Sequence, residues 1–388
     1  MSEPKRYAVT ADIVFDGETK RASSAVVIEG PVVVCVMPQS ELPASLGRRK
    51  LPNGSWLAPG FVDVQVNGGG DVLFNATPTP EAILTIAAAH RKFGTTAFLP
   101  TFITDTCEKM SAAVTAVRSL VETEPSVLGI HLEGPFLSPE KAGAHDASLM
   151  RQPSPQDLEM LCADRRGILL ITLAPERVAK GFIARLVESD IRVALGHSMA
   201  TYKETRAAMA EGLTGFTHLF NAMRPIASRE PGPIAAALET PDAFFGLIVD
   251  GFHVDPAVLR FALRGLGRPI LVTDAMPPVG GNQSRFDLYG AEIHVRDGRC
   301  VRSDGTLAGA ALDMATAVRN CVRLLGVQLE DALRFASRNP AEFVGMQHIL
   351  GRVAAGYRAD LVAFDPETLD VIATWVAGIE SEEVPVGI

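Results

Sequence analysis

The sequence lacks the features that mark membrane-spanning, secreted or disulfide-stabilised proteins. No stretch of its 388 residues reaches the roughly 18 consecutive apolar residues that a membrane-spanning helix needs, and the amino-terminal segment lacks the apolar core of a signal peptide. Cysteine is scarce, with five residues and no CxxC pair. An odd number of widely spaced cysteines favours reduced thiols over a disulfide framework. We therefore expect a cytoplasmic protein.

An excess of basic residues is also absent. The formal net charge of −9 at pH 7 disfavours nucleic acid and anionic membranes as partners. It leaves room for an anionic small molecule, because a few local cations can hold one phosphate. The hydrophobic content of 47% and the charged content of 21% describe a globular protein with a large core. The chain is also longer than one ordinary domain.

Short strand-like segments separated by Gly and Pro occupy both ends of the sequence. SAVVIEG and VVVCVM are examples near the amino terminus, and GRVAAGYRADLVAFD near the carboxyl terminus reads the same way. Two such terminal blocks can pair into one small β-sandwich and leave the middle as a separate domain. We predict a small β domain from residues 1–57 and 350–388, and a larger domain from residues 58–349.

Strand-like and helix-like segments alternate in the middle of the sequence. Amphipathic stretches such as PEAILTIAAAHRKFG separate apolar runs that are typical of buried parallel strands. The strand candidates are APGFVDVQVNGGG, TTAFLPTFI, VLGIHLEGP, ILLITLAPE, RVALGHS, GFTHLFNAM, FGLIVDGFH and PILVTDAMPP. Eight strands alternating with helices predict an α/β protein with a closed (β/α)8 barrel. Residues 285–309 break the pattern and resemble a hairpin inserted after the last strand.

Four of these runs end in a side chain that can bind a metal ion or carry a proton. They are Glu133, His197, His218 and Asp274. Because the carboxyl ends of barrel strands meet at one mouth, we expect the four side chains to converge there. Two imidazoles and one carboxylate are the ligand set of a catalytic zinc-type site. A further carboxylate beside a metal-activated water is the usual general base.

Other interpretations exist for each of these residues taken alone. A single histidine is more often a buried structural residue than a ligand. Glu133 could cap a helix or pair with a loop cation, but the Gly-Pro that follows it argues against a helix beginning there. Asp274 could be a solvated turn residue. The shared position at strand ends is what favours a common site.

The first strand of the expected barrel lacks the His-x-His pair with which many metal hydrolases of this architecture hold a second metal. Gln65 and Asn67 stand there instead, in DVQVNG. Amides are poor ligands for zinc. We therefore expect one divalent ion per chain, most simply Zn2+, with other divalent transition metals open. Gln65 and Asn67 are interpreted as a vestigial second-metal position.

Other histidines have less distinctive surroundings. His131 shares the strand face of Glu133, so it either belongs to the barrel interior or lines the site. His145 and His253 lie in loops and are candidates for contacts with a substrate. The remaining three are interpreted as structural, namely His90, His294 and His348.

Long and specific motifs run along nearly the whole chain. They are APGFVDVQVNGGG, HLEGPFLSPEKAGAHD, ALGHSMATY, GFTHLFNAM, SREPG, DGFHVDP, LVTDAMPP and NPAEFVG. Together they resemble the motifs of the N-acetylglucosamine-6-phosphate deacetylases of the amidohydrolase superfamily. The resemblance implies a barrel of the metal-dependent amidohydrolase type, and it implies one divalent metal bound by Glu133, His197 and His218.

The same resemblance implies roles for residues around that metal. Asp274 would be the catalytic acid and base, and His145 would contact the substrate near its reacting carbonyl. Arg229 in SREPG would bind the phosphate from the neighbouring subunit of a homodimer. Arg224 departs from the family pattern and adds a cation near the site. The residues that line the sugar phosphate site would be Ala144, Asn221, Ala222, Asp250, His253, Leu307, Ala308 and Gly309.

The implied reaction is hydrolysis of N-acetyl-D-glucosamine 6-phosphate to D-glucosamine 6-phosphate and acetate, by metal-activated water with Asp274 as general base and acid. The galactosamine epimer stays open, because the orientation of one hydroxyl depends on loop detail. Opening of a cyclic amide is disfavoured, since the His-x-His pair is missing. A non-catalytic assembly protein is disfavoured too, because all four strand-end residues are present.

Overall fold

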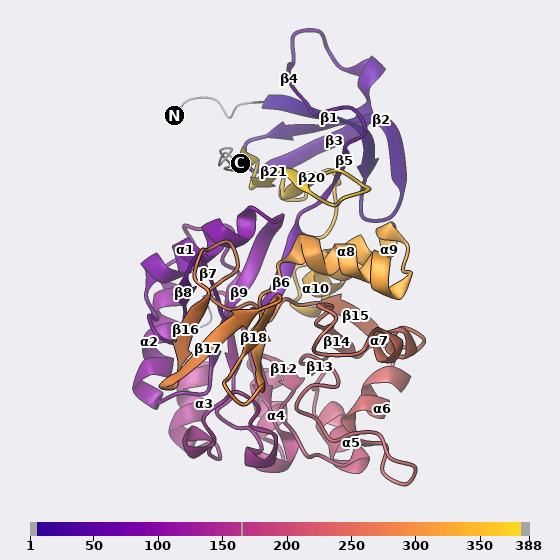
Figure 1. The fold of residues 1–388 in the computed structure, drawn as a ribbon. Coiled ribbons are helices and arrows are strands. Elements are labelled where there is room, and N and C mark those ends of the chain that lie inside the picture. Colours follow the sequence, from indigo (N-terminus) through magenta and orange to yellow (C-terminus); the bar gives the residue numbers. More distant parts are fainter. Residues whose placement is uncertain (1–5, 164–165, 382–388) are drawn as a thin grey trace. The chain divides into compact units, whose positions relative to one another are not determined.

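Eight strands in the middle of the chain form one sheet in the computed structural model, which describes residues 6–163 and 166–381. Their order in the sheet follows their order in the sequence (Figure 1). The strands are β6 (Phe61–Val66), β9 (Thr95–Ile103), β10 (Gly129–Glu133), β11 (Ile168–Leu173), β12 (Arg192–Leu195), β13 (Gly215–Phe216), β14 (Phe244–Leu247) and β15 (Arg268–Leu271). Neighbours from β9 to β15 pair in parallel.

The two ends of this sheet meet just beyond the last strand. The backbone N–H of Asp274 donates to the carbonyl of Gln65 at 3.0 Å. Val66 and Ala275 form a parallel bridge beside that bond. The segment after β15 therefore lies against the end of β6, and the predicted (β/α)8 barrel is confirmed.

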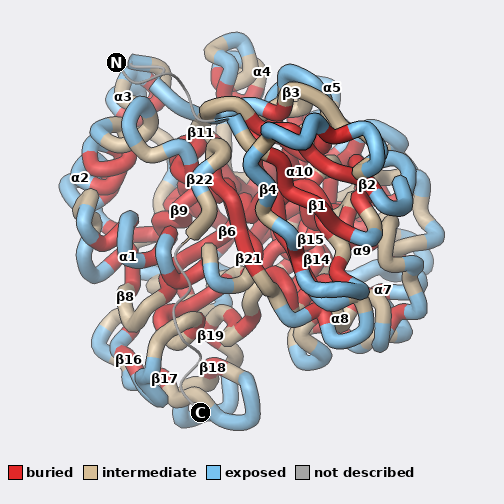
Figure 2. Tube along the Cα trace, turned by 90° about the horizontal axis from the view of Figure 1, so that it is seen from above, coloured by how far each residue is buried: buried red, intermediate tan, exposed pale blue. Residues whose placement is uncertain are grey.

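The barrel strands are buried on both faces. Every residue of β6, β9, β10 and β14 is buried (Figure 2), as expected for parallel strands covered by helices. Polar side chains are enclosed among them, and His131 is one that is hydrogen-bonded on both sides. His131 contacts the hydroxyl of Thr101 through Nδ1 at 3.1 Å and that of Thr172 through Nε2 at 2.7 Å. His131 is thus an interior residue of the barrel.

Helices follow the strands along the chain. They are α1 (Pro80–Arg91), α2 (Cys107–Arg118), α3 (Pro155–Cys162), α4 (Phe182–Glu188), α5 (Tyr202–Ala210), α6 (Gly232–Glu239) and α7 (Pro256–Ala262). Local sequence starts several of them. Thr201 and Glu204 form a reciprocal capping box at the beginning of α5, which satisfies two backbone groups that would otherwise lack partners. The loops also contain short 3-10 turns, η2 (Pro139–Lys141), η3 (Ala147–Leu149) and η4 (Pro175–Arg177).

A small antiparallel sheet follows the last barrel strand. Its strands are β16 (Arg285–Leu288), β17 (Ala291–Arg296), β18 (Arg299–Val301) and β19 (Leu307–Ala310). The stretch 285–309, predicted to resemble a hairpin, forms the hairpin of β16 and β17 and continues into β18 and β19. Tyr289 and Gly290 connect the hairpin with φ values of 55° and 76°, as a two-residue turn of this kind requires. A two-stranded ribbon, β7 (Gly68–Gly69) and β8 (Val72–Leu73), follows β6.

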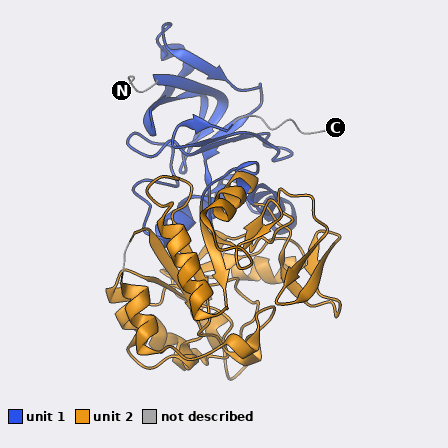
Figure 3. Ribbon diagram, turned by 90° about the vertical axis from the view of Figure 1, so that its left-hand side faces the viewer, with its two compact units in different colours: residues 1–63, 90–97, 314–388 blue, residues 64–89, 98–313 orange. Residues whose placement is uncertain are grey.

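The chain divides into two compact units (Figure 3). One unit comprises Val64–Ala89 and Phe98–Asp313. The other combines Met1–Asp63, His90–Ala97 and Met314–Ile388. It includes α8 (Met314–Leu325), α9 (Leu329–Ala336) and α10 (Arg338–Phe343), which the predicted boundary at residues 349 and 350 assigns to the barrel. That boundary stays a prediction, and residues 1–5 and 382–388 of the predicted small domain lie outside the described residues.

The second of these units contains a sheet built from both ends of the chain. Its strand order is β22-β21-β20-β5-β1-β2-β3, with β4 beside β1. β5 pairs antiparallel with β20, which joins the two terminal segments. Trp375 is fully buried in the apolar cluster of this sheet. The strands are β1 (Arg6–Phe15), β2 (Lys20–Glu29), β3 (Val32–Pro38), β4 (Gly47–Lys50), β5 (Trp56–Pro59), β20 (Leu361–Phe364), β21 (Val371–Val376) and β22 (Ile379–Glu380).

Two further expectations concern the thiols and the helices. All five cysteines are free thiols, as predicted. Cys300 and Cys321 are buried, whereas Cys107 is exposed. Among the described residues, no helix is both long enough and apolar enough to cross a membrane.

Candidate active site

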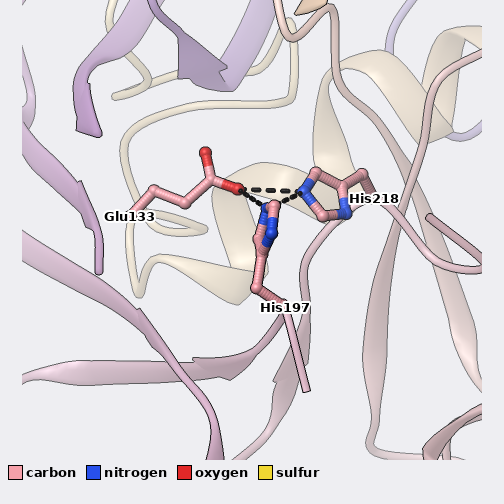
Figure 4. A group of neighbouring side chains, drawn as sticks. All are labelled: Glu133, His197 and His218. Atoms are coloured by element: carbon pink, nitrogen blue, oxygen red, sulfur yellow. Dashed lines mark hydrogen bonds and ion pairs between the residues drawn. The ribbon is translucent and has the colours of Figure 1, made fainter. Parts of the chain in front are cut away.

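Three predicted site residues meet at the carboxyl ends of the barrel strands. Glu133 is the last residue of β10, while His197 and His218 lie just beyond β12 and β13. Oε1 of Glu133 lies 3.1 Å from Nε2 of His197 and 2.9 Å from Nε2 of His218 (Figure 4). The two Nε2 atoms are 3.1 Å apart. All three side chains are buried, and their ligand atoms form a group that could hold a metal ion.

The protonation of His197 suits a metal ligand. Its Nδ1 lies 2.7 Å from the carbonyl oxygen of Lys141. Because a carbonyl oxygen only accepts, Nδ1 carries a proton, and the ring is held with Nε2 directed at Glu133 and His218. Nδ1 of His218 is buried without a hydrogen-bond partner. Two imidazole nitrogens and a carboxylate oxygen this close together are a donor set that fits a divalent metal.

The backbone at the strand ends has an uncommon conformation. His197, His218 and Asp274 have φ values of 47°, 32° and 48°. This left-handed region costs a non-glycine residue about 1–3 kcal/mol, and such residues cluster at functional sites. Histidine and aspartate are among the types found there most often. In all three cases, this backbone conformation occurs where a barrel strand has ended and the following loop begins.

Asp274 lies beside the cluster and is held by two amide side chains. Its Oδ1 accepts from Nδ2 of Asn67 at 2.6 Å and from Nε2 of Gln65 at 3.3 Å. Burial, together with the negative charge of Glu133, raises the pKa of Asp274 to about 6. A carboxyl group with a pKa near neutrality can both accept and return a proton.

His145 lies against the metal-capable cluster from the loop between η2 and η3. Its ring centroid is 4.4 Å from that of His197. Its Nδ1 lies 2.9 Å from the hydroxyl of Thr104. Burial, together with the charge of His197, lowers the pKa of His145 to about 3, so its imidazole is neutral. The sequence offered no signal for Thr104, which follows β9 in an ordinary apolar run.

A pocket of about 400 Å³ opens over these residues. Most of the predicted substrate residues line it, namely Ala144, His145, Asn221, Ala222, His253, Leu307, Ala308 and Gly309. The structure adds lining residues that the sequence did not indicate, namely Ile103, Gly143, Ile248, Met276, Leu288, Gly305 and Thr306. Leu288, Gly305 and Thr306 belong to the small antiparallel sheet and its loops, so this insertion helps to form the pocket.

Three predicted residues lie outside the pocket lining. Asp250 contacts the lining residue His253, with its Oδ2 2.6 Å from Nδ1 of that ring. Gln65 lies beneath the lining, with Nε2 hydrogen-bonded to Glu133 and Asp274.

Arg229, the third of these residues, is exposed on a loop. Its neighbour Glu230 holds this loop in place, because Glu230 Oε1 accepts from the backbone N–H groups of residues 202 and 232 at 2.7 and 3.0 Å.

Arg224, the extra cation, uses part of its side chain in a hydrogen bond to the backbone. Its Nε donates to the carbonyl of Met199 at 2.8 Å, and its backbone N–H donates to the carbonyl of Ser198 at 3.0 Å. Both acceptors belong to the loop directly after His197. Arg224 therefore ties two loops of the barrel mouth together.

A family model of the amidohydrolase family matches residues 56–387. The chain belongs to the amidohydrolase family. Its members are metal-dependent hydrolases, and the buried Glu133–His197–His218 group agrees with that chemistry. The expectation of a metal-dependent hydrolase is confirmed, while the identity of the metal is a separate question.

This amidohydrolase is similar over nearly its whole length to deacetylases of amino-sugar phosphates. It is 42% identical to an N-acetylgalactosamine-6-phosphate deacetylase of Shewanella sp. (strain ANA-3), over 85% of this chain and 84% of the relative. It is 35% identical to an N-acetylglucosamine-6-phosphate deacetylase of Haemophilus influenzae, over 96% and 98%. The solved structure of N-acetylglucosamine-6-phosphate deacetylase from Pasteurella multocida matches with a TM-score of 0.94 at 36% identity, covering 97% of this chain and 99% of that one.

Proposed function

We propose that this amidohydrolase hydrolyses the acetamide of N-acetyl-D-glucosamine 6-phosphate to D-glucosamine 6-phosphate and acetate. The observation that carries the proposal is one pocket that contains the Glu133–His197–His218 group, Asp274 and His145 together. The likeness to the deacetylases from Haemophilus influenzae and Pasteurella multocida supports the substrate class.

Each side chain has a chemical role in this reaction. Glu133, His197 and His218 would hold one divalent ion, most simply zinc, which when bound lowers the pKa of a water molecule and polarises a carbonyl. Asp274 would take a proton from the attacking water and deliver it to the amine nitrogen as the C–N bond breaks. The neutral ring of His145 would donate a hydrogen bond to the oxygen on which negative charge develops.

The phosphate group needs a cation that the pocket does not supply. Among the described lining residues there is no Lys or Arg, yet a phosphate is bound best by charge-assisted donors. His253, oriented by Asp250, offers one ring nitrogen. The exposed Arg229 would complete the site of the neighbouring subunit, and we infer a homodimer on this ground. The free thiols support a cytoplasmic location.

The galactosamine epimer is a second candidate substrate. The N-acetylgalactosamine-6-phosphate deacetylase of Shewanella sp. shares 42% identity with this chain over 85% of its length. The two substrates differ only in the orientation of one hydroxyl, which the metal-capable cluster and Asp274 do not need to contact. Both epimers therefore fit the same reaction.

Acetate release from each epimer tests the proposal directly. Zinc-loaded protein should release acetate from N-acetyl-D-glucosamine 6-phosphate, with a higher kcat/KM than for the galactosamine epimer or for the unphosphorylated sugar. A higher kcat/KM for the galactosamine epimer would replace the first substrate with the second. Absence of acetate from both phosphates, in protein with its metal content assayed, would reject the deacetylase proposal. An Asp274→Asn variant provides the negative control.

A further inference from the structure

Gln65 and Asn67 stand where related metal hydrolases have a His-x-His pair, but both make specific hydrogen bonds. Their NH2 groups donate to the same oxygen of Asp274, Oδ1, at 3.3 and 2.6 Å. We propose that Gln65 and Asn67 are positioning residues. Together they form an amide clamp, which determines which carboxylate oxygen of Asp274 accepts and returns the proton. This inference rests on the proposed deacetylation, and it replaces the interpretation of the two amides as vestigial.

The orientation of the Asn67 amide follows from its partner. A carboxylate oxygen only accepts, so the atom 2.6 Å from Asp274 Oδ1 is the NH2 group. The side-chain oxygen of Asn67, Oδ1, is then buried without a hydrogen-bond partner. A buried acceptor left unpaired costs about 1–3 kcal/mol. Among the described residues, the carboxylate of Asp274 is therefore the hydrogen-bond partner of the Asn67 side chain.

Gln65 links the acid/base to the metal-capable cluster. Its NH2 group lies 3.1 Å from Oε2 of Glu133 and 3.3 Å from Oδ1 of Asp274. Oε1 of Glu133 faces the two histidines, so Gln65 contacts the other oxygen of that carboxylate. A donor between two buried carboxylates weakens their mutual repulsion and sets their spacing.

The clamp leaves Asp274 with one oxygen for chemistry. Both amides occupy Oδ1, and in the described part of the chain no hydrogen bond reaches Oδ2. Asp274 lines the pocket. Proton uptake from water and delivery to the amine then take place at Oδ2, whose direction is set because rotation of the carboxylate would break the bonds at Oδ1.

The experiment places an Asn67 substitution in two backgrounds. Asn67→Leu keeps the branched shape and removes the donor, and Asn67→Ala serves as a second variant where Leu does not fold. Each is measured in the wild type and in Asp274→Asn, with kcat, KM and metal content determined on the epimer that the wild type deacetylates. Thr205→Val is the control, because Thr205 is also buried but its hydroxyl donates to the carbonyl of Thr201, away from the pocket lining.

If the clamp acts through Asp274, replacing Asn67 should lower kcat in the wild-type background but not in Asp274→Asn. In the wild type, kcat should fall about 10–100-fold, the usual effect of losing a second partner around a site. KM should stay within about threefold, metal content should be unchanged, and the control should keep its kcat. In Asp274→Asn, the same substitution should change the residual kcat by less than about threefold, because residues that act as a unit are not additive.

Several results would overturn the clamp. They are an equal loss of kcat in both backgrounds, an equal loss of kcat in Thr205→Val, loss of metal, or an unchanged kcat when Asn67 alone is replaced. A crystal structure of Asn67→Leu adds a readout without turnover. The carboxylate of Asp274 should rotate away from the orientation described above, and an unmoved carboxylate argues against the clamp. If the wild type releases no acetate, the proposed function fails, and the crystal structure still tests the clamp.

Discussion

The hydroxyl of Thr104 lies 2.9 Å from Nδ1 of His145 and 3.4 Å from the carbonyl oxygen of Glu133. Both contacts involve the same hydroxyl, so Thr104 ties the ring of His145 to the end of the strand that carries Glu133. Nδ1 is occupied by this contact, so Nε2 is the ring nitrogen that can face a substrate oxygen. The hydroxyl of Tyr289 donates to the carbonyl of Thr104. Tyr289, from the hairpin turn of the inserted sheet, thereby helps to hold Thr104 against His145.

Removal of the Thr104 hydroxyl should impair turnover while substrate binding is kept. Thr104→Val preserves the shape of the side chain but removes the hydroxyl that holds the ring of His145 in place. We expect kcat to fall about 10–100-fold, as for other second-layer partners of a site. Thr104→Ser, which restores a hydroxyl, should recover most of the activity. Equal kcat values for the Val and Ser variants would contradict a role for this hydrogen bond.

One divalent ion per chain should be required for activity. The Glu133–His197–His218 group is the metal-capable cluster, and Gln65 and Asn67 offer amide donors rather than imidazole ligands. Elemental analysis of active protein should find about one ion per chain. Chelation should abolish acetate release, and one equivalent of zinc should restore it. Two ions per chain, both needed for turnover, would contradict the single-metal account.

Replacement of Asp274 by Asn should abolish most turnover. The substitution keeps the shape of the side chain but removes the group that accepts and returns the proton. We expect kcat to fall by at least about 10²–10⁴, the range for general acid–base catalysis. Substrate affinity, measured by calorimetry, should survive. A variant with more than about a tenth of the wild-type kcat would show that another group carries the proton.

Arg229→Ala should weaken binding of the phosphorylated substrate in particular. A guanidinium can offer two parallel hydrogen bonds to phosphate. KM should rise far more for the phosphorylated sugar than for the unphosphorylated one. An equal rise for both sugars would argue against a phosphate contact.

Mixing Arg229→Ala with Asp274→Asn chains tests whether the site is shared between subunits. If Arg229 serves the partner's site, each mixed dimer has one site with both defects and one site with neither. Activity should then return on subunit exchange. If both residues serve their own chain, every site keeps a defect, so exchange without recovered activity would refute the shared site.

The sequence alone determined the barrel and the strand-end residues. Glu133, His197, His218 and Asp274 were recognisable because an apolar strand followed by a polar turn is a local pattern, and parallel strands present their carboxyl ends on one side. The left-handed backbone of the two histidines and Asp274 agrees with the residue types found there, although no pattern specified it.

Only the tertiary structure decided which of these groups touch. Asn67 and Asp274 are 207 positions apart and lie 2.6 Å from each other at the point where the barrel closes. Thr104 and His145 meet across 41 positions. Such contacts depend on the register of every strand between them and on the loops that fill the mouth. Residue type and periodicity report the face and the end of one element, whereas distances between elements are set by packing of the whole barrel.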